Sequence, residues 1–192
     1  MIEQVLQTAT LFDIVIGLVA MAVFVVGWLQ GAIRQLLGIG VLLVAFIFAG
    51  GLREPLGNFL ATNWTYNDRG FNLMLAMLGV WIAATVTLII GIQAFYKRVV
   101  IHRRLVILDE ILGGLLGAGQ VILVVAMLVV IFDSYYATLA SGEAARDAGW
   151  THALWLLLRD SAVANALRDG FIPAMVTILG PLLPADVVAP SR

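Results

Sequence analysis

The sequence predicts an all-α integral membrane protein in which four transmembrane helices are followed by a short amphipathic helical tail. Of the 192 residues, 62% are hydrophobic and only 12% are charged, and the mean hydropathy is +1.03. This composition is too apolar for a soluble domain of this length. Long apolar runs separated by polar connections place the spans at about residues 12–30, 35–52, 71–95 and 110–132. We therefore expect a four-helix transmembrane domain over 1–133 and a membrane-surface tail over 134–192.

Charge and residue counts argue against several classes of function. The formal net charge of −1 argues against a nucleic-acid-binding surface. The chain has no cysteine, so it has neither disulfides nor thiolate metal sites. Its two histidines, His102 and His152, have no second ligand at a recognisable spacing, and no acid–base pair lies within the spans. We expect no metal, no cofactor and no enzymatic activity.

The first span carries an acidic residue at its start and small residues along one face. Asp13 stands directly before the apolar run 14–29, where its carboxylate can cap the helix. An ion-binding or proton-carrying role and an interfacial ion pair are the alternatives for Asp13. Gly17, Gly27 and Gly31 follow helical spacing and form a stripe on which another helix can pack. Gly31 can also supply the unusual dihedral angles of a tight turn into the second span.

The last span carries a second small-residue face. Gly113, Gly117 and Gln120 recur at i+4 and i+3, so they lie on one side of the helix. Two such faces predict that the first and last spans pack on each other. Gln120 lies 11 residues after Asp109, or about 16 Å along the axis at helical rise, which places its amide near the bilayer midplane. A polar group at that depth is expected to find a protein partner.

Two charged residues are expected at the opposite membrane face from Asp13. Asp109 is predicted to cap the start of the last span and to pair with Arg34. Arg34 is also placed to reach lipid phosphates from the interface. Five basic residues in the first and third connections outnumber three on the other side, which predicts that both termini are periplasmic. The five are Arg34, Lys97, Arg98, Arg103 and Arg104, and the three are Arg53, Arg69 and Arg146.

The tail recovers charge but keeps apolar segments. Trp150, Leu154 and Leu157 form an apolar stripe opposite Asp147 and Thr151, which is typical of a helix that lies on a membrane surface. A second apolar segment, 171–183, is only 13 residues long and is interrupted by two prolines and a glycine. It is therefore too short and too broken to span a bilayer. We expect this segment to be interfacial or docked on the protein.

Over residues 12–132 the arrangement resembles the colicin V production protein (CvpA) family of small bacterial inner-membrane proteins. The matching residues are Asp13 before the first span, Gly27, Gly31 and Arg34 around the first turn, and Asp109, Leu112, Gly113, Gly117 and Ala118 in the last span. Gln30, Gln35 and Gln120 depart from the family's pattern, which often has charged residues there. The resemblance implies a non-enzymatic, multi-pass inner-membrane protein needed for colicin V production or export and connected with envelope homeostasis.

A different class of function is a small transporter or channel subunit. In that reading Gln120, Thr85, Thr87 and Gln93 line a polar path through the helix bundle, because buried polar groups in spans often mark substrate routes. The same groups can simply bond between helices. In either case the expected partners are the lipid bilayer and other membrane proteins or further copies of the chain, and no nucleic acid.

Overall fold

The computed structural model describes residues 10–63, 68–96, 106–139 and 149–184, and every regular element in these ranges is a helix. The four long helices are α2 (Leu11–Gln30), α3 (Ala32–Asn63), α4 (Arg69–Tyr96) and α5 (Val106–Tyr136). The tail consists of α7 (Trp150–Asp160), α8 (Ala162–Ala166), the π-helical η1 (Leu167–Phe171), α9 (Ile172–Leu179) and the 3₁₀ turn η2 (Gly180–Leu182). The prediction of an all-α membrane protein is confirmed at the level of fold class.

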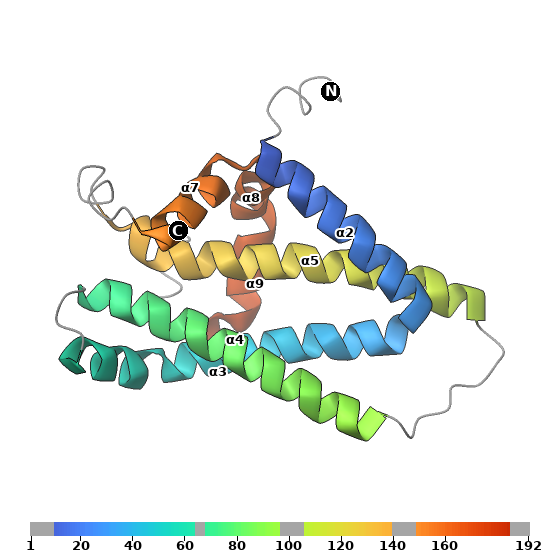
Figure 1. The fold of residues 1–192 in the computed structure, drawn as a ribbon, viewed down its shortest axis with the longest axis horizontal. Helices are drawn as coiled ribbons and strands as arrows, with labels where there is room; N and C mark the ends of the chain where they lie inside the picture. Colours follow the sequence, from blue (N-terminus) through green and yellow to red (C-terminus); the bar gives the residue numbers. More distant parts are fainter. Residues whose placement is uncertain (1–9, 64–67, 97–105, 140–148, 185–192) are drawn as a thin grey trace.

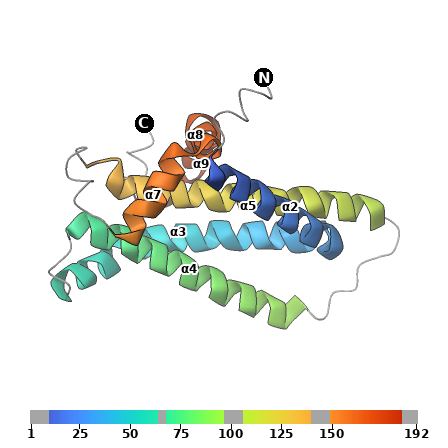
Figure 2. The same ribbon diagram turned by 45° about the horizontal axis from the view of Figure 1, so that its top comes forward.

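The long helices form a row rather than a closed ring. Helices α3 and α5 run side by side and parallel in the centre, α2 packs chiefly on α5, and α4 packs antiparallel on α3 (Figure 1). A view turned by 45° shows the same row, with α5 above α3 and α4 below it (Figure 2). As a result α2 and α4 lie on opposite sides of the central pair.

Helix α3 continues well past the residues that the sequence suggested would end the second span. It runs through Pro55 to Asn63, 32 residues in all. A proline in a helix interior lacks the N–H that would bond to the carbonyl four residues earlier, here that of Gly51. Both Pro55 and Gly51 lie on an exposed face, where solvent can satisfy that carbonyl. The break is therefore tolerated, and α3 extends beyond its apolar run.

The tail contains a fifth stretch that is long and apolar enough to cross a membrane, whereas the sequence predicted four. It runs over Ala162–Leu182 as a continuous helical segment of 21 residues. The π turn η1 lies directly before Pro173, which takes an early position in α9 where its missing N–H costs little. The prediction that the prolines and glycines break this segment is wrong for Pro173. In Figure 1 the stretch runs across α5 rather than along it.

The core lies between α3, α4, α5 and the tail. Large side chains are fully buried there, while α2 and the outer faces of the other helices expose apolar residues. The buried set includes Phe46, Met74, Met77, Met127, Phe132 and Tyr136. The exposed set includes Leu11, Leu18, Leu29, Phe48, Ile90 and Ile107. An apolar exterior of this extent is the surface of a protein that is solvated by lipid.

Candidate functional site

Buried and half-buried polar residues gather at the two ends of the row of helices. We call the group at the α2–α3 turn the turn centre and define it as Gly31, Ala32, Gln35, Asp109 and Gln120. We call the group that joins the tail to α2 the tail joint and define it as Asp13 and residues 161–163. The sequence identified some members of each group as candidate site residues, and the structure shows the groups to which they bond.

The turn centre begins with Gly31, which alone separates α2 from α3. Its φ of 82° and ψ of 163° lie in a region that is essentially restricted to glycine. A Cβ atom at this position would also collide with the carboxylate of Asp109. The prediction that Gly31 supplies the turn is confirmed, and the residue is required for conformation and for space.

Asp109 caps a helix, but not the helix to which it belongs. Helix α5 already begins at Val106, and Asp109 Oδ1 accepts a hydrogen bond of 3.0 Å from the backbone N–H of Ala32 at the start of α3. Its negative charge therefore faces the positive end of the α3 dipole. The prediction that Asp109 caps its own span is wrong. Arg34 is exposed, and within the described part of the chain it forms no ion pair with Asp109.

The structure brings four of the predicted glycines into one helix contact and leaves the fifth outside it. A Cβ atom on Gly113 would lie 2.7 Å from the carbonyl carbon of Gly31 and still closer to the carbonyl oxygen of Gly27. A Cβ atom on Gly117 would lie 2.7 Å from the carbonyl oxygen of Val23. Helices α2 and α5 thus touch backbone to backbone. Gly17 has no neighbouring atom within 4 Å and takes no part.

Gln120 finds its partner on α3 rather than on α2. Its Nε2 donates a hydrogen bond of 2.9 Å to the backbone carbonyl of Gln35, and it occupies the space that a side chain on Gly38 would fill. The Gln35 side chain is buried and its Nε2 lies 3.5 Å from Oε1 of Gln30. Three amides therefore link α2, α3 and α5 at this end. In the sequence Gln35 stood out only as a departure from a family pattern. Its contact with Gln120 uses the backbone carbonyl, which every residue has, so no sequence pattern could predict it.

The tail joint is organised by Asp13, whose carboxylate serves two helices. It accepts bonds from the backbone N–H and the hydroxyl of Thr10, at 2.8 and 2.9 Å, as the third residue of a capping box. It also accepts from the Ser161 hydroxyl and from the backbone N–H groups of Ala162 and Val163, the last two at 3.1 Å. Thr10, not Asp13, is the N-cap of α2. The spacing Thr-x-x-Asp is the sequence signal that could have identified it.

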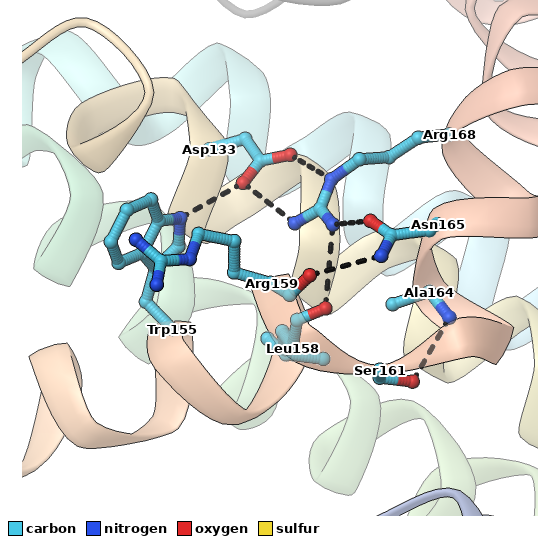
Figure 3. Close-up of polar contacts among 8 residues, drawn as sticks. All are labelled: Asp133, Trp155, Leu158, Arg159, Ser161, Ala164, Asn165 and Arg168. Atoms are coloured by element: carbon cyan, nitrogen blue, oxygen red, sulfur yellow. Dashed lines mark hydrogen bonds and ion pairs between the residues drawn. The ribbon is translucent and has the colours of Figure 1, made fainter. Parts of the chain in front are cut away.

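A second contact holds the tail to the end of α5 (Figure 3). Arg168 reaches Asp133 with two nitrogens, Nε to Oδ2 at 2.8 Å and an NH2 nitrogen to Oδ1 at 3.0 Å. Trp155 donates its indole N–H to the same Oδ1 at 3.1 Å. Arg168 also bonds to the carbonyl of Leu158 and to Oδ1 of Asn165. The sequence marked Asp133 only as the end of a span, because its partners come from 22 and 35 residues further along the chain.

The other polar residues singled out in the sequence do not line a continuous polar path in the described part of the chain. Thr87 is exposed and bonds to the carbonyl of Ala83 in its own helix. Thr85 Oγ1 and Trp81 Nε1 are buried without a hydrogen-bond partner, one turn apart on α4. The Gln93 side chain, His102, Asp147 and the basic connection 97–104 lie outside the described residues. Across the described ranges no three His, Asp or Glu side chains are close enough to hold a metal ion.

The turn centre and the tail joint therefore have the same structural role. Each carboxylate or amide bonds to backbone groups of another helix, so it fixes how two helices meet. Residues 12–170, which include both groups, match the family model described as colicin V production protein. The chain belongs to this family. No curated protein and no solved structure matches it.

For this colicin V production family member, the match extends further than the resemblance seen in the sequence. That resemblance covered residues 12–132 and extended to the tail only loosely, through Ser161 and the terminal proline-containing stretch, whereas the family model continues through α7, α8 and most of η1. The matched region thus contains Asp133, Ser161 and Arg168, the residues that dock the tail. Helix α9 and η2 lie beyond the matched residues.

Proposed function

We propose that this chain is a non-enzymatic accessory protein of the bacterial inner membrane that supports toxin production or export and envelope homeostasis. It would act by packing against partner membrane proteins. The observation that carries the proposal is the family match over residues 12–170. The family's description names production of a toxin and no reaction.

The contacts of the buried and half-buried polar side chains support this function. Asp13, Asp109 and Gln120 each bond to a backbone group of a neighbouring helix. Groups held in this way organise a scaffold, since a catalytic acid or base must keep an atom available to substrate. The exposed apolar faces of α2 and α4 leave a large surface on which lipid or partner spans can pack.

Complementation tests this function directly. A colicin V producer that lacks its own family member should regain toxin secretion when it expresses this chain at normal abundance. The matched control is a Gly117→Leu variant, which should accumulate poorly and fail to restore secretion. If the folded wild-type chain restores nothing in such strains, the accessory role is contradicted.

A transporter or channel subunit is the second candidate, and the orphaned groups on α4 favour it. Trp81 Nε1 and Thr85 Oγ1 lie buried without hydrogen-bond partners, and in lipid such groups are costly unless a polar molecule visits them. Purified chain in proteoliposomes should conduct no small solutes or ions if the accessory role is correct. Flux that Thr85→Val abolishes, with folding intact, would favour the transporter instead.

A further inference from the structure

Helix α7 carries large apolar residues on its outer face as well as on the face that packs on α5. Thr151 is 1% exposed and its hydroxyl lies 2.8 Å from the hydroxyl of Tyr136 on α5. Trp150, Leu154 and Leu157 point outward and are 63%, 37% and 47% exposed. On a helix that faces water, the apolar stripe covers the core and the polar residues are outside. The exposed stripe therefore indicates an apolar environment along the first two turns of α7, before the exposed pair Arg159 and Asp160.

The exposure of Trp150, Leu154 and Leu157 does not come from free rotation of α7 about its axis. The opposite face of α7 is held to α5 by Trp155, whose indole N–H bonds to Asp133, and by Leu158, which is 2% exposed. Tyr136, His152 and Trp155 stack against one another, with ring centroids 5.3 to 5.8 Å apart. These contacts fix the rotation of α7 about its axis, so the stripe stays outside.

The position of α7 on the bundle identifies the apolar environment. The helix docks where the uncharged run of α5 ends at Phe132 and Asp133 follows. Thr151 bonds to Tyr136 at this end, so the neighbouring, exposed Trp150 lies there too, and Trp is enriched where a span leaves the membrane. A helix that crosses the end of a span at this level lies at the boundary between headgroups and acyl chains.

The next helices continue the same surface. Phe171, Ile178 and Leu182 are exposed on η1, α9 and η2, while Ile172 and Met175 face the core. The whole stretch runs across α5 in Figure 1, which suits a segment lying along the membrane plane. The exposed charges of α7, Arg159 and Asp160, cancel, so no basic surplus directs this surface to anionic headgroups.

From the exposed apolar stripe of α7 we infer that α7, η1 and α9 form an interfacial anchor whose outer side chains insert into the lipid of the same bilayer that the long helices cross. Trp150, Leu154 and Leu157 are its principal contacts. Insertion is driven by apolar burial, so neutral and anionic lipids serve equally. The anchor holds the tail helices in the membrane plane and is independent of the accessory role proposed above.

Spin labelling tests the anchor in the full chain, which has no native cysteine to remove. Leu154→Cys and Leu157→Cys variants are labelled with a nitroxide and reconstituted into phosphatidylcholine vesicles. Asp160→Cys, on the exposed end of the same helix, is the matched control. Power saturation should show higher oxygen and lower nickel-chelate accessibility at positions 154 and 157 than at position 160. Addition of phosphatidylglycerol should leave this difference unchanged.

Three other outcomes would overturn the anchor. Equal nickel-chelate accessibility at 154, 157 and 160 would place the stripe in water. Labels at 154 that are shielded from both reagents and broadened by a neighbouring label would place a second copy of the chain on the stripe. Insertion that occurs only with phosphatidylglycerol would replace apolar burial by recognition of anionic headgroups. Size-exclusion profiles matching the wild type establish that each variant is folded.

Discussion

At the residue scale, Gly31 is subject to two constraints at once. Its backbone adopts dihedral angles that cost other residues about 1–3 kcal/mol, and the Asp109 carboxylate fills the place of a side chain. Gly17, within α2, has neither constraint. Gly17 and Gly31 are therefore expected to respond oppositely to the same substitution.

Gly31→Ala is expected to destabilise the protein in detergent by at least about 1–3 kcal/mol, the cost of the strained backbone alone. Gly17→Ala should be neutral or stabilising by up to about 1 kcal/mol, because alanine has the higher helix propensity. Unfolding by SDS titration, followed by circular dichroism, measures both. Equal stability of the two variants would mean that the α2–α3 turn does not have the conformation described.

Substitutions of Asp109 can separate the role of its hydrogen-bond acceptor oxygen from the role of its negative charge. Asp109→Asn keeps an acceptor for the Ala32 N–H and should retain most folded protein, whereas Asp109→Leu should lose about 0.5–2 kcal/mol as helix caps do. Abundance in membranes and thermal stability in detergent are the measurements. An Asn variant that folds normally yet fails in complementation would show that the carboxylate charge has a function of its own.

At the scale of elements, the contact between α2 and α5 depends on the absence of side chains. Lipid offers no hydrophobic drive for helix association, so close backbone approach and dispersion supply it. Gly117 lies against the carbonyl oxygen of Val23, while Gly119 on the same helix has no atom within 4 Å. Comparing substitutions at Gly117 and Gly119 therefore separates the effect of the helix contact from the effect of replacing any glycine in α5.

Gly117→Leu should therefore lower stability in detergent by about 2–5 kcal/mol or prevent folding, the larger end being set by the backbone clash. Gly119→Leu, the control, should change it by less than about 0.5 kcal/mol. Thermal melting of the purified chain, or its yield where melting is not possible, compares them. A tolerated Gly117→Leu would contradict the close contact of the two helices.

The ion pair between the tail and α5 makes a similar comparison possible. Arg168→Ala removes the bonds to Asp133, Leu158 and Asn165, each charged bond contributing about 1.5–3 kcal/mol before the partial exposure of the pair reduces it. Limited proteolysis should then cut within residues 149–184 while α2–α5 stay intact. Arg159→Ala, on the exposed side of α7, should leave the digestion pattern unchanged. Equal protection in both variants would contradict docking through Arg168.

The features of the helices that could be predicted are those whose signal lies within a single helix. Uncharged runs located the four long helices, and the glycine spacing in α2 and α5 anticipated their contact, because both signals lie within one helix. The roles of the two aspartates did not follow. Asp13 and Asp109 bond to amides 149 and 77 residues away, and a local reading assigns a carboxylate to the nearest helix. The continuity of Ala162–Leu182 was missed because a π turn before Pro173 has no sequence signature.

At the scale of the whole molecule, the row of helices places its hydrogen-bonded charged and amide side chains at two levels. Asp109 and Gln35 lie at one end, and Asp13, Asp133 and Arg168 lie at the other. The lipid-facing surface of α2 connects these levels. With the anchor inferred above, a bilayer that crosses the row between the two levels would leave the tail helices along one face of the membrane, and the basic connections predict on which side that face lies.

Reporter fusions test both the sidedness and the path of Ala162–Leu182. Five basic residues against three predict that a fusion after Asp133 is active as a periplasmic phosphatase and dark as a cytoplasmic fluorescent protein. A fusion after Pro184 should behave in the same way, because a segment lying along the membrane plane does not change sides. A fusion in the basic connection 97–104 is the control and should show the opposite pattern. If the fusion after Pro184 alone is cytoplasmic, Ala162–Leu182 crosses the bilayer as a fifth span; if all three are reversed, the sides are inverted while the four long spans remain.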